Sequence, residues 1–164
     1  MTTPLLEGFP PVVDDAAGLL ILGSFPSVQS LATGQYYANP RNAFWPITST
    51  LFGFDTSAPY ETRLAALQSA GVALWDVLHR CRRVGSLDAR IDPKSLAAND
   101  FCGLFAAFPS IRQVCFNGGA ARKFFSRLVD VDAGLQYRLL PSTSPARAMP
   151  AAEKLRAWGV IAAS

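Results

Sequence analysis

The sequence predicts an α/β fold, a three-layer α/β/α sandwich around a short, mainly parallel four-stranded sheet. Apolar runs of strand length, bounded by glycine, proline or polar residues, recur along the chain. Helical patterns lie between these runs, and such alternation is typical of a parallel sheet covered by helices on both faces. Half of the residues are apolar, so a chain of this length can bury a substantial core.

The elements follow one another in a regular order. Strands are expected at 18–23, 71–75, 114–116 and 137–140, and helices at 44–52, 61–70, 95–108, 120–128 and 151–158. Apolar residues at helical spacing support the helix at 95–108, and segment 85–93 is expected to form a long loop near the mouth of the site. No repeat or linker interrupts the pattern, which predicts a single domain over residues 1–164.

Composition excludes several classes of protein. No apolar run reaches the roughly 18 residues of a membrane span, and residues 1–11 lack the features of a signal peptide, so a cytoplasmic protein is expected. The net charge of +3 and the pI of about 9.0 suit a DNA backbone as partner, but equally a soluble basic protein. A monomer is the expected oligomeric state.

The metal-binding residue types form no recognisable site. Cys81, Cys102 and Cys115 are widely spaced and match no zinc or iron–sulfur pattern, which favours reduced and mostly buried thiols. The only histidine, His79, lies in a basic run that is typical of a solvated helix end. The sequence therefore predicts no metal and no cofactor.

Polar or turn-forming segments follow each expected strand and should meet at one edge of the sheet, where α/β domains place their ligands. The first, 23–27, lacks the lysine of a P-loop, and no base partner for Ser24 is evident. Phe25 is either a platform that stacks on a planar ligand or a core residue. Aromatic rings and neutral amides crowd the following segment, 35–45, and together suit a nucleobase.

Two later strand ends carry groups that suit a nucleic acid. Asn117 can read a base edge with both its donor and its acceptor, or simply form a turn before two glycines. The segment 141–145 offers hydroxyl and N–H groups that suit phosphates, although a turn that caps the last helix explains it equally well.

Asn42 is the strongest candidate for a role in chemistry. Asn42 is a candidate N-cap of the helix at 44–52, but Pro46 favours the first turn, which would place the cap nearer Trp45 and leave the Asn42 side chain in the loop. A neutral amide is a weak base, but it can orient a water molecule toward a sugar carbon whose bond to the base is already breaking.

In this order and spacing, the motifs resemble the uracil-DNA glycosylase superfamily. The resemblance covers about residues 19–158 and is greatest to the branch of hypoxanthine (deoxyinosine) DNA glycosylases, which is related to the mismatch-specific uracil/thymine enzymes. Its carriers are Gly-Ser-x-Pro-Ser at 23–27, Tyr-Tyr-x-x-Pro-Arg-Asn-x-Phe-Trp at 36–45, the segments 71–78 and 85–88, Phe-Asn-Gly at 116–118, and Leu-Pro-Ser-Thr-Ser-Pro at 140–145.

The resemblance implies a monofunctional DNA glycosylase that flips out a deaminated base, hypoxanthine or uracil or xanthine, and leaves an abasic site. It also implies that Asn42 positions the water. Most branches of the superfamily carry Asp or Asn in the first motif for this purpose, whereas this branch lacks it and this chain has Ser24 there. The substrate-binding residues would be Gly23, Ser24, Phe25, Pro26, Tyr37 and Asn117. The residues that contact DNA would be Ser142, Thr143, Ser144 and Arg147.

Two features limit how much of the family's site can be assigned to this chain. The branch often has asparagine where this chain has Arg147, so the DNA contacts there are expected to differ. The iron–sulfur branches need four cysteines, and this chain has three. Two other functions remain open on the residues alone: a nucleic-acid-binding module without turnover, and a hydrolase of free nucleosides.

Overall fold

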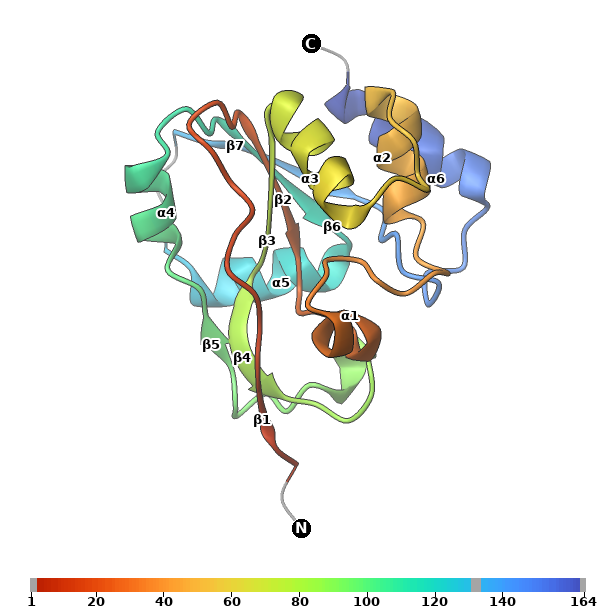
Figure 1. Cartoon of the computed structure of the whole chain (residues 1–164). Helices are drawn as coiled ribbons and strands as arrows, with labels where there is room; N and C mark the ends of the chain where they lie inside the picture. Colours follow the sequence, from red (N-terminus) through yellow and green to blue (C-terminus); the bar gives the residue numbers. More distant parts are fainter. Residues whose placement is uncertain (1–2, 131–133, 163–164) are drawn as a thin grey trace.

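Four parallel strands form the centre of the molecule (Figure 1). In the computed structural model, which describes residues 3–130 and 134–162, the sheet order is β3-β2-β6-β7. The strands are β2 (Leu19–Gly23), β3 (Val72–Asp76), β6 (Gln113–Asn117) and β7 (Gln136–Leu140). All three neighbouring pairs are parallel, so the four carboxyl ends lie along one edge.

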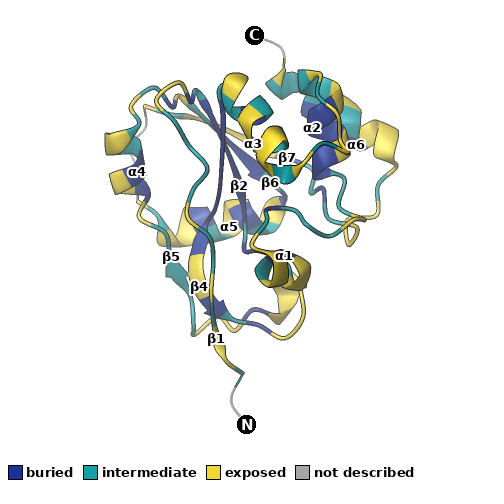
Figure 2. Ribbon diagram, viewed as in Figure 1, coloured by how far each residue is buried: buried dark blue, intermediate teal, exposed yellow. Residues whose placement is uncertain are grey.

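The central strands are buried on both faces, and alternate residues enter two separate cores. Leu20 and Leu22 of β2 pack with α4 (Phe101–Ala107) and α5 (Gly119–Leu128). Leu19 and Ile21 pack on the other face with α2 (Phe44–Phe52), α3 (Tyr60–Ser69) and α6 (Ala151–Trp158). Figure 2 shows the central strands in the dark blue of buried residues. The predicted three-layer α/β/α sandwich is confirmed.

A small antiparallel sheet in the order β1-β4-β5 was not predicted from the sequence. Its strands are β1 (Leu5–Glu7), β4 (Leu78–Arg82) and β5 (Ala97–Ala98). His79 therefore lies in a strand, and the predicted helix end at that position is wrong. The predicted helix at 95–108 begins only at Phe101, because β5 occupies its first turn and the Asp100 side chain caps α4.

Two short elements lie near the carboxyl edge of the parallel sheet. The sequence did not suggest α1 (Val28–Thr33), which begins at the capping residue Ser27 and ends at Gly34 with φ of 71°. The predicted loop at 85–93 contains a single 3₁₀ turn, η1 (Asp88–Arg90), and a second, η2 (Gly159–Ile161), follows α6. The chain between β2 and α2 crosses the carboxyl edge of the sheet, and α2 then covers one face.

Candidate active site

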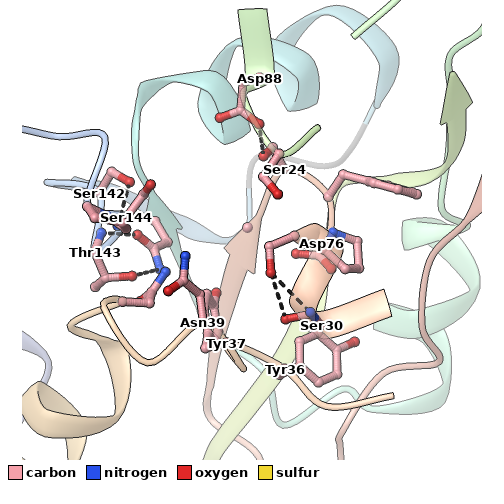
Figure 3. Close-up of a pocket in the computed structure, with 18 residues that line it drawn as sticks. Ser24, Ser30, Tyr36, Tyr37, Asn39, Asp76, Asp88, Ser142, Thr143 and Ser144 are labelled. Carbon is pink, nitrogen blue, oxygen red and sulfur yellow. Dashed lines mark hydrogen bonds between the residues drawn. The ribbon is translucent and has the colours of Figure 1, made fainter. Parts of the chain in front are cut away.

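A pocket lies at the carboxyl edge of the parallel sheet (Figure 3). The end of each strand, or the segment that follows it, contributes to its lining: Gly23, Asp76, Asn117 and Ser142. The segments that close it carry the other lining residues, among them Ser24, Phe25, Pro26, Tyr37, Asn42, Asp88, Thr143 and Ser144. The structure thus brings together all the residues predicted from the sequence for this site except Arg147, which is exposed and does not line the pocket.

One wall of the pocket is held by a two-point contact between strand β6 and the segment after β7. We define the wall as Asn117, Ser142, Thr143 and Ser144. The Asn117 Nδ2 donates to Thr143 Oγ1 and its Oδ1 accepts from the Thr143 N–H, both at 2.9 Å. Thr143 is almost fully buried and contacts Asn117 with its hydroxyl. The shape of this wall is therefore set by the backbone position of Thr143 rather than by freely rotating side chains.

Two residues of α6 support the wall from behind. Lys154 is buried, and its Nζ donates to the Ser144 carbonyl at 3.1 Å. The Trp158 Nε1 donates to the Pro141 carbonyl at 2.8 Å. Gly118 has φ of 95°, and a Cβ there would lie 2.9 Å from the Ser142 Cβ. Gly118 thus approaches Ser142 so closely that this position requires glycine.

The floor of the pocket consists of Gly23, Tyr37 and Asp76. Gly23 and Asp76 are register partners at the ends of β2 and β3. A Cβ on Gly23 would lie 2.5 Å from Asp76 Oδ1 and 3.3 Å from Tyr37 Oη. The missing side chain at Gly23 therefore leaves room for the two polar groups beside it.

Asp76 is 4% exposed, and its Oδ2 has no hydrogen-bond partner among the described residues. Burial, together with the charge of Asp88, raises the pKa of this carboxyl to about 7, and the charge of Arg83 opposes the change. At neutral pH a large share of the Asp76 side chains is consequently protonated and can donate a hydrogen bond as well as accept one.

Tyr37 is held in an unusual backbone conformation. It is the only residue other than glycine with positive φ in the described part of the chain, at 57°. Its ring stacks on Phe44, with centroids 3.9 Å apart and planes at 23°. The Oη is buried and forms no hydrogen bond of standard geometry with a described residue. Burial, followed by the nearby Asp76, raises its pKa, and the adjacent Asn117 amide opposes the rise. Packing on α2 thus holds a strained residue at the floor.

The mouth of the pocket is formed by Ser24, Ser86 and Asp88. The Ser24 hydroxyl donates to Asp88 Oδ1 at 2.6 Å, so the chain does supply Ser24 with an acidic partner. The Ser86 hydroxyl accepts from the Val28 N–H at 2.9 Å. Buried Arg83 donates to the carbonyls of Gly85 and Pro26, each at 2.6 Å. These contacts fix the segment after β4 to the segment after β2.

Arg83 also packs against the ring of Phe25. The guanidinium carbon lies 5.2 Å from the centre of the Phe25 ring, and the ring is 7% exposed and belongs to the core beneath the sheet. Phe25 therefore packs in the core, one of the two alternatives drawn from the sequence, and also lines the pocket.

Asn42 precedes α2 and caps it, contrary to expectation. The helix begins at Phe44, its formal N-cap residue Ala43 makes no side-chain bond, and Asn42 Oδ1 accepts from the Phe44 N–H at 2.9 Å. The expectation that the cap lies nearer Trp45 was wrong, because the side chain of Asn42 reaches past Ala43. Asn42 still lines the pocket, so one oxygen has a structural role while the amide group borders the cavity.

Sequence reasoning missed the two carboxyl groups of the site. Asp76 and Asp88 both line the pocket, and neither was assigned a role. One signal was available for Asp76, since a charged residue that directly ends an apolar strand is seldom there for packing. Asp88 lies in the loop 85–93, which was expected near the mouth of the site, but nothing in the sequence pairs it with Ser24 across 64 positions of the chain.

No group of three or more histidine, cysteine, aspartate or glutamate side chains in residues 3–130 and 134–162 is arranged to hold a metal ion. Two of the three cysteines, Cys81 and Cys115, are buried, whereas Cys102 is exposed. None of the helices in the described ranges is long and apolar enough to cross a membrane.

Comparison with known proteins identifies the family. The family model of the uracil DNA glycosylase superfamily matches residues 10–163. A hypoxanthine DNA glycosylase of Methanosarcina acetivorans is 36% identical over 156 residues, which cover 94% of this chain and 96% of that protein. A hypoxanthine DNA glycosylase of Methanosarcina barkeri is 33% identical over 153 residues, covering 93% of this chain and 94% of its own length.

A solved structure agrees. The solution NMR structure of a Methanosarcina acetivorans protein, described as a candidate uracil DNA glycosylase, superposes with a TM-score of 0.79 at 34% sequence identity. The match covers 96% of this chain and 99% of that one. The chain belongs to the uracil DNA glycosylase superfamily.

Proposed function

We propose that the chain is a monofunctional DNA repair glycosylase that flips hypoxanthine out of DNA and hydrolyses its N-glycosidic bond, leaving an abasic site. Uracil and xanthine are the other candidate bases. The observation that carries the proposal is a pocket built from all four strand ends, in a chain that two hypoxanthine DNA glycosylases match over more than nine-tenths of its length. A monomer that acts in the cytoplasm is part of the proposal.

The pocket receives a base that has left the helix. Flipping costs a few kcal/mol and is easiest for a mispaired base, which favours deaminated bases. In this proposal Phe25 and Tyr37 flank the base, with Gly23, Ser24 and Pro26 forming the surface against which it rests. Both rings are held by packing, Tyr37 on Phe44 and Phe25 beside Arg83, so little side-chain entropy is lost on binding.

Asn117 reads the edge of the base in addition to holding the wall. A carboxamide has two N–H groups and two oxygen lone pairs, and its contacts with Thr143 use one of each. One N–H and one lone pair remain, and the Tyr37 hydroxyl lies close to this amide. Because the contact with Thr143 fixes the orientation of the amide, the remaining donor and acceptor have a defined direction.

Asn42 positions the attacking water. As the bond between the sugar and the base breaks, the sugar gains positive charge and becomes a strong electrophile, so a water molecule needs orientation more than deprotonation. The Asn42 Oδ1 is anchored by the Phe44 N–H at 2.9 Å, which holds the amide at the border of the pocket.

The segment after β7 contacts the DNA backbone. Ser142 and Ser144 line the pocket and carry hydroxyl groups, and Arg147 is exposed beyond them. We assign phosphate contacts to these three residues. Thr143 is buried against Asn117 and contributes by holding the segment in place rather than by a side-chain contact with DNA.

The proposal is tested by base release from labelled duplexes that each contain one deoxyinosine, deoxyuridine or deoxyxanthosine. Wild-type protein and the Asn42→Ala variant are compared at equal duplex occupancy. Asp55→Ala is the matched control, because Asp55 Oδ1 accepts from the Ser57 N–H at 2.8 Å in the same local arrangement, away from the pocket. Both substitutions remove a side-chain oxygen that accepts from the backbone N–H two residues later, so the control reproduces the cost of that lost bond, about 1 kcal/mol of stability.

We expect the wild type and Asp55→Ala to release hypoxanthine, and Asn42→Ala to bind the duplex but release the base at least about 100-fold more slowly. Release from deoxyuridine alone would preserve the glycosylase and overturn hypoxanthine as its base. Binding without release from any duplex would support the binding module. Release from free deoxyinosine at the same rate would support the nucleoside hydrolase.

A further inference from the structure

The floor of the pocket contains the carboxyl group of Asp76, which has no role in the steps proposed above. Asp76 lines the pocket at the end of β3, and only 4% of the residue is exposed. Its backbone is fixed on both sides, since the Asn99 Nδ2 donates to the Asp76 carbonyl at 2.8 Å and the Val77 N–H donates to the Gly23 carbonyl at 2.8 Å. The carboxyl is therefore held in place by the sheet.

The Asp76 carboxyl faces Gly23 at the floor of the pocket. Gly23 has no side chain to cover Oδ1, and Oδ2 has no hydrogen-bond partner among the described residues. Structural carboxyl groups that are this deeply buried are normally paired or fully hydrogen-bonded, because an unsatisfied one costs stability. A group kept unsatisfied in a ligand pocket indicates that the ligand satisfies it.

We propose that Asp76 is a catalytic residue that donates a proton to the departing base, at N7 of hypoxanthine. The proposal rests on the function given above and adds the step that makes the base a better leaving group. A purine that departs from N9 without protonation carries away a negative charge, whereas protonation at N7 lets it depart as a neutral molecule.

The Asp76 O–H bond breaks and its proton forms a bond with N7, while the electron pair of the C1′–N9 bond moves to the base. The water that Asn42 orients adds to C1′, and the proton that it loses passes to solvent. After the base has left, the Asp76 carboxylate takes a proton from solvent, so the net reaction is hydrolysis alone.

The charged and titratable groups around Asp76 suit this role. Asp88 reaches it from the segment after β4 and favours the protonated acid, Arg83 from the same segment favours the carboxylate, and Tyr36 and Tyr37 border it from the loop before α2. Burial and Asp88 together prevail over Arg83 and raise the pKa to about 7. A general acid is most effective when its pKa lies near the working pH.

The test measures single-turnover release of hypoxanthine from about pH 5 to about pH 9 by the wild type, Asp76→Asn and Asp15→Asn. Asparagine has the shape of aspartate but no acidic proton. Asp15 is exposed and precedes β2, at the opposite edge of the sheet from the pocket, so it controls for the chemical change. A second duplex carries 7-deaza-2′-deoxyinosine, which lacks the nitrogen that would accept the proton.

We expect the wild type and Asp15→Asn to lose about tenfold in rate per pH unit above pH 7. We expect Asp76→Asn to be at least about 100-fold slower below that pH and to show no such decline. The wild type should bind the 7-deaza duplex but release its base at least about 100-fold more slowly than hypoxanthine.

Several results would overturn the proposal. Asp76→Asn that keeps both the wild-type rate and the wild-type pH profile would remove Asp76 from the chemistry while leaving the proposed function intact. Release of 7-deazahypoxanthine at the rate of hypoxanthine would do the same, and it decides the question even if Asp76→Asn fails to fold. A wild-type protein that releases no hypoxanthine would overturn the proposed function and this proposal together.

Discussion

The floor and the wall of the pocket differ in how their polar groups are satisfied. In the wall, Asn117 and Thr143 exchange two hydrogen bonds of 2.9 Å. In the floor, Tyr37 Oη and Asp76 Oδ2 are buried with no partner in the described part of the chain. Each unsatisfied group costs about 1 to 3 kcal/mol of stability, whereas the bonds in the wall stabilise the fold.

This difference separates the two kinds of residue that surround a ligand. A satisfied polar group has a structural role that persists without the ligand, and its loss is felt in stability first. An unsatisfied group lowers the stability of the empty protein, and its loss reduces activity without reducing stability. Substitutions in the wall should therefore lower stability, whereas substitutions in the floor should lower activity and leave stability unchanged or higher.

The largest expected effect concerns the stability of the protein as a function of pH. The pKa of Asp76 rises from an ordinary 3.8 to about 7 on folding, so the unfolded chain ionises first. The free energy of unfolding should fall as the pH rises from about 4 to about 7, and the pKa difference corresponds to on the order of 4 kcal/mol. Urea unfolding across this range, with Asp76→Asn beside the wild type, measures it.

Asp76→Asn should lack this decline and should equal or exceed the wild type in stability at neutral pH. Asp15→Asn provides the comparison, since Asp15 is exposed and should keep the decline. A decline of equal size in Asp76→Asn would show that another group in the protein titrates, and would break the contrast between floor and wall.

The fold itself was largely predictable, because the apolar strands are buried on both faces and leave a strong pattern. Leu19 to Leu22 enter two cores alternately and still read as one continuous apolar run. The antiparallel sheet was not predictable in the same way. Strand β4 mixes buried Leu78 and Cys81 with the exposed His79 and Arg80, and a short run of this kind resembles a helix end as closely as a strand.

The site was predictable where its residues follow strands. Gly23, Asn117 and the segment at 141–145 meet because parallel strands end at one edge. Asp88 could not be placed, since its contact with Ser24 depends on the path of a long loop. The capping role of Asn42 was also missed, because the preference of Pro46 for the first turn does not decide which residue supplies the cap.

Gly23→Ala is expected to have the next largest effect. The added Cβ would lie 2.5 Å from Asp76 Oδ1 and would displace the carboxyl from the floor. A displacement of about 1 Å at a reacting group reduces rates by about 100-fold, so base release should fall by at least that factor. Single-turnover assays with saturating protein measure the change.

The control is Gly18→Ala, which adds the same methyl group just before the other end of β2, where nothing lies within 4 Å. It should keep the rate of the wild type. Equal rates in Gly23→Ala and the wild type would show that the floor can move without consequence and that Asp76 has no fixed role in catalysis.

Asn117→Ala should lower both stability and activity, as expected of a wall residue that also contacts the base. The substitution removes two hydrogen bonds and leaves the buried Thr143 N–H without a partner, which should cost about 2 to 3 kcal/mol in the free energy of unfolding. Thr143→Ser keeps the hydroxyl that accepts from Asn117 and should lose less than half as much. Equal losses in the two variants would place the stabilisation in the Thr143 methyl group instead.

The smallest effect is expected for Tyr37→Phe, and it is the one that distinguishes the floor from the wall most directly. The substitution removes only the hydroxyl oxygen, which has no hydrogen-bond partner among residues 3–130 and 134–162, and keeps the stacking on Phe44. The free energy of unfolding should stay within about 0.5 kcal/mol of the wild type or rise, because an unsatisfied group has been removed. Affinity for a deoxyinosine duplex should fall about five- to tenfold if the hydroxyl bonds the flipped base, which a binding titration measures. A loss of stability above about 1 kcal/mol without a loss of affinity would place Tyr37 among the structural residues, so that Asp76 alone would distinguish the floor from the wall.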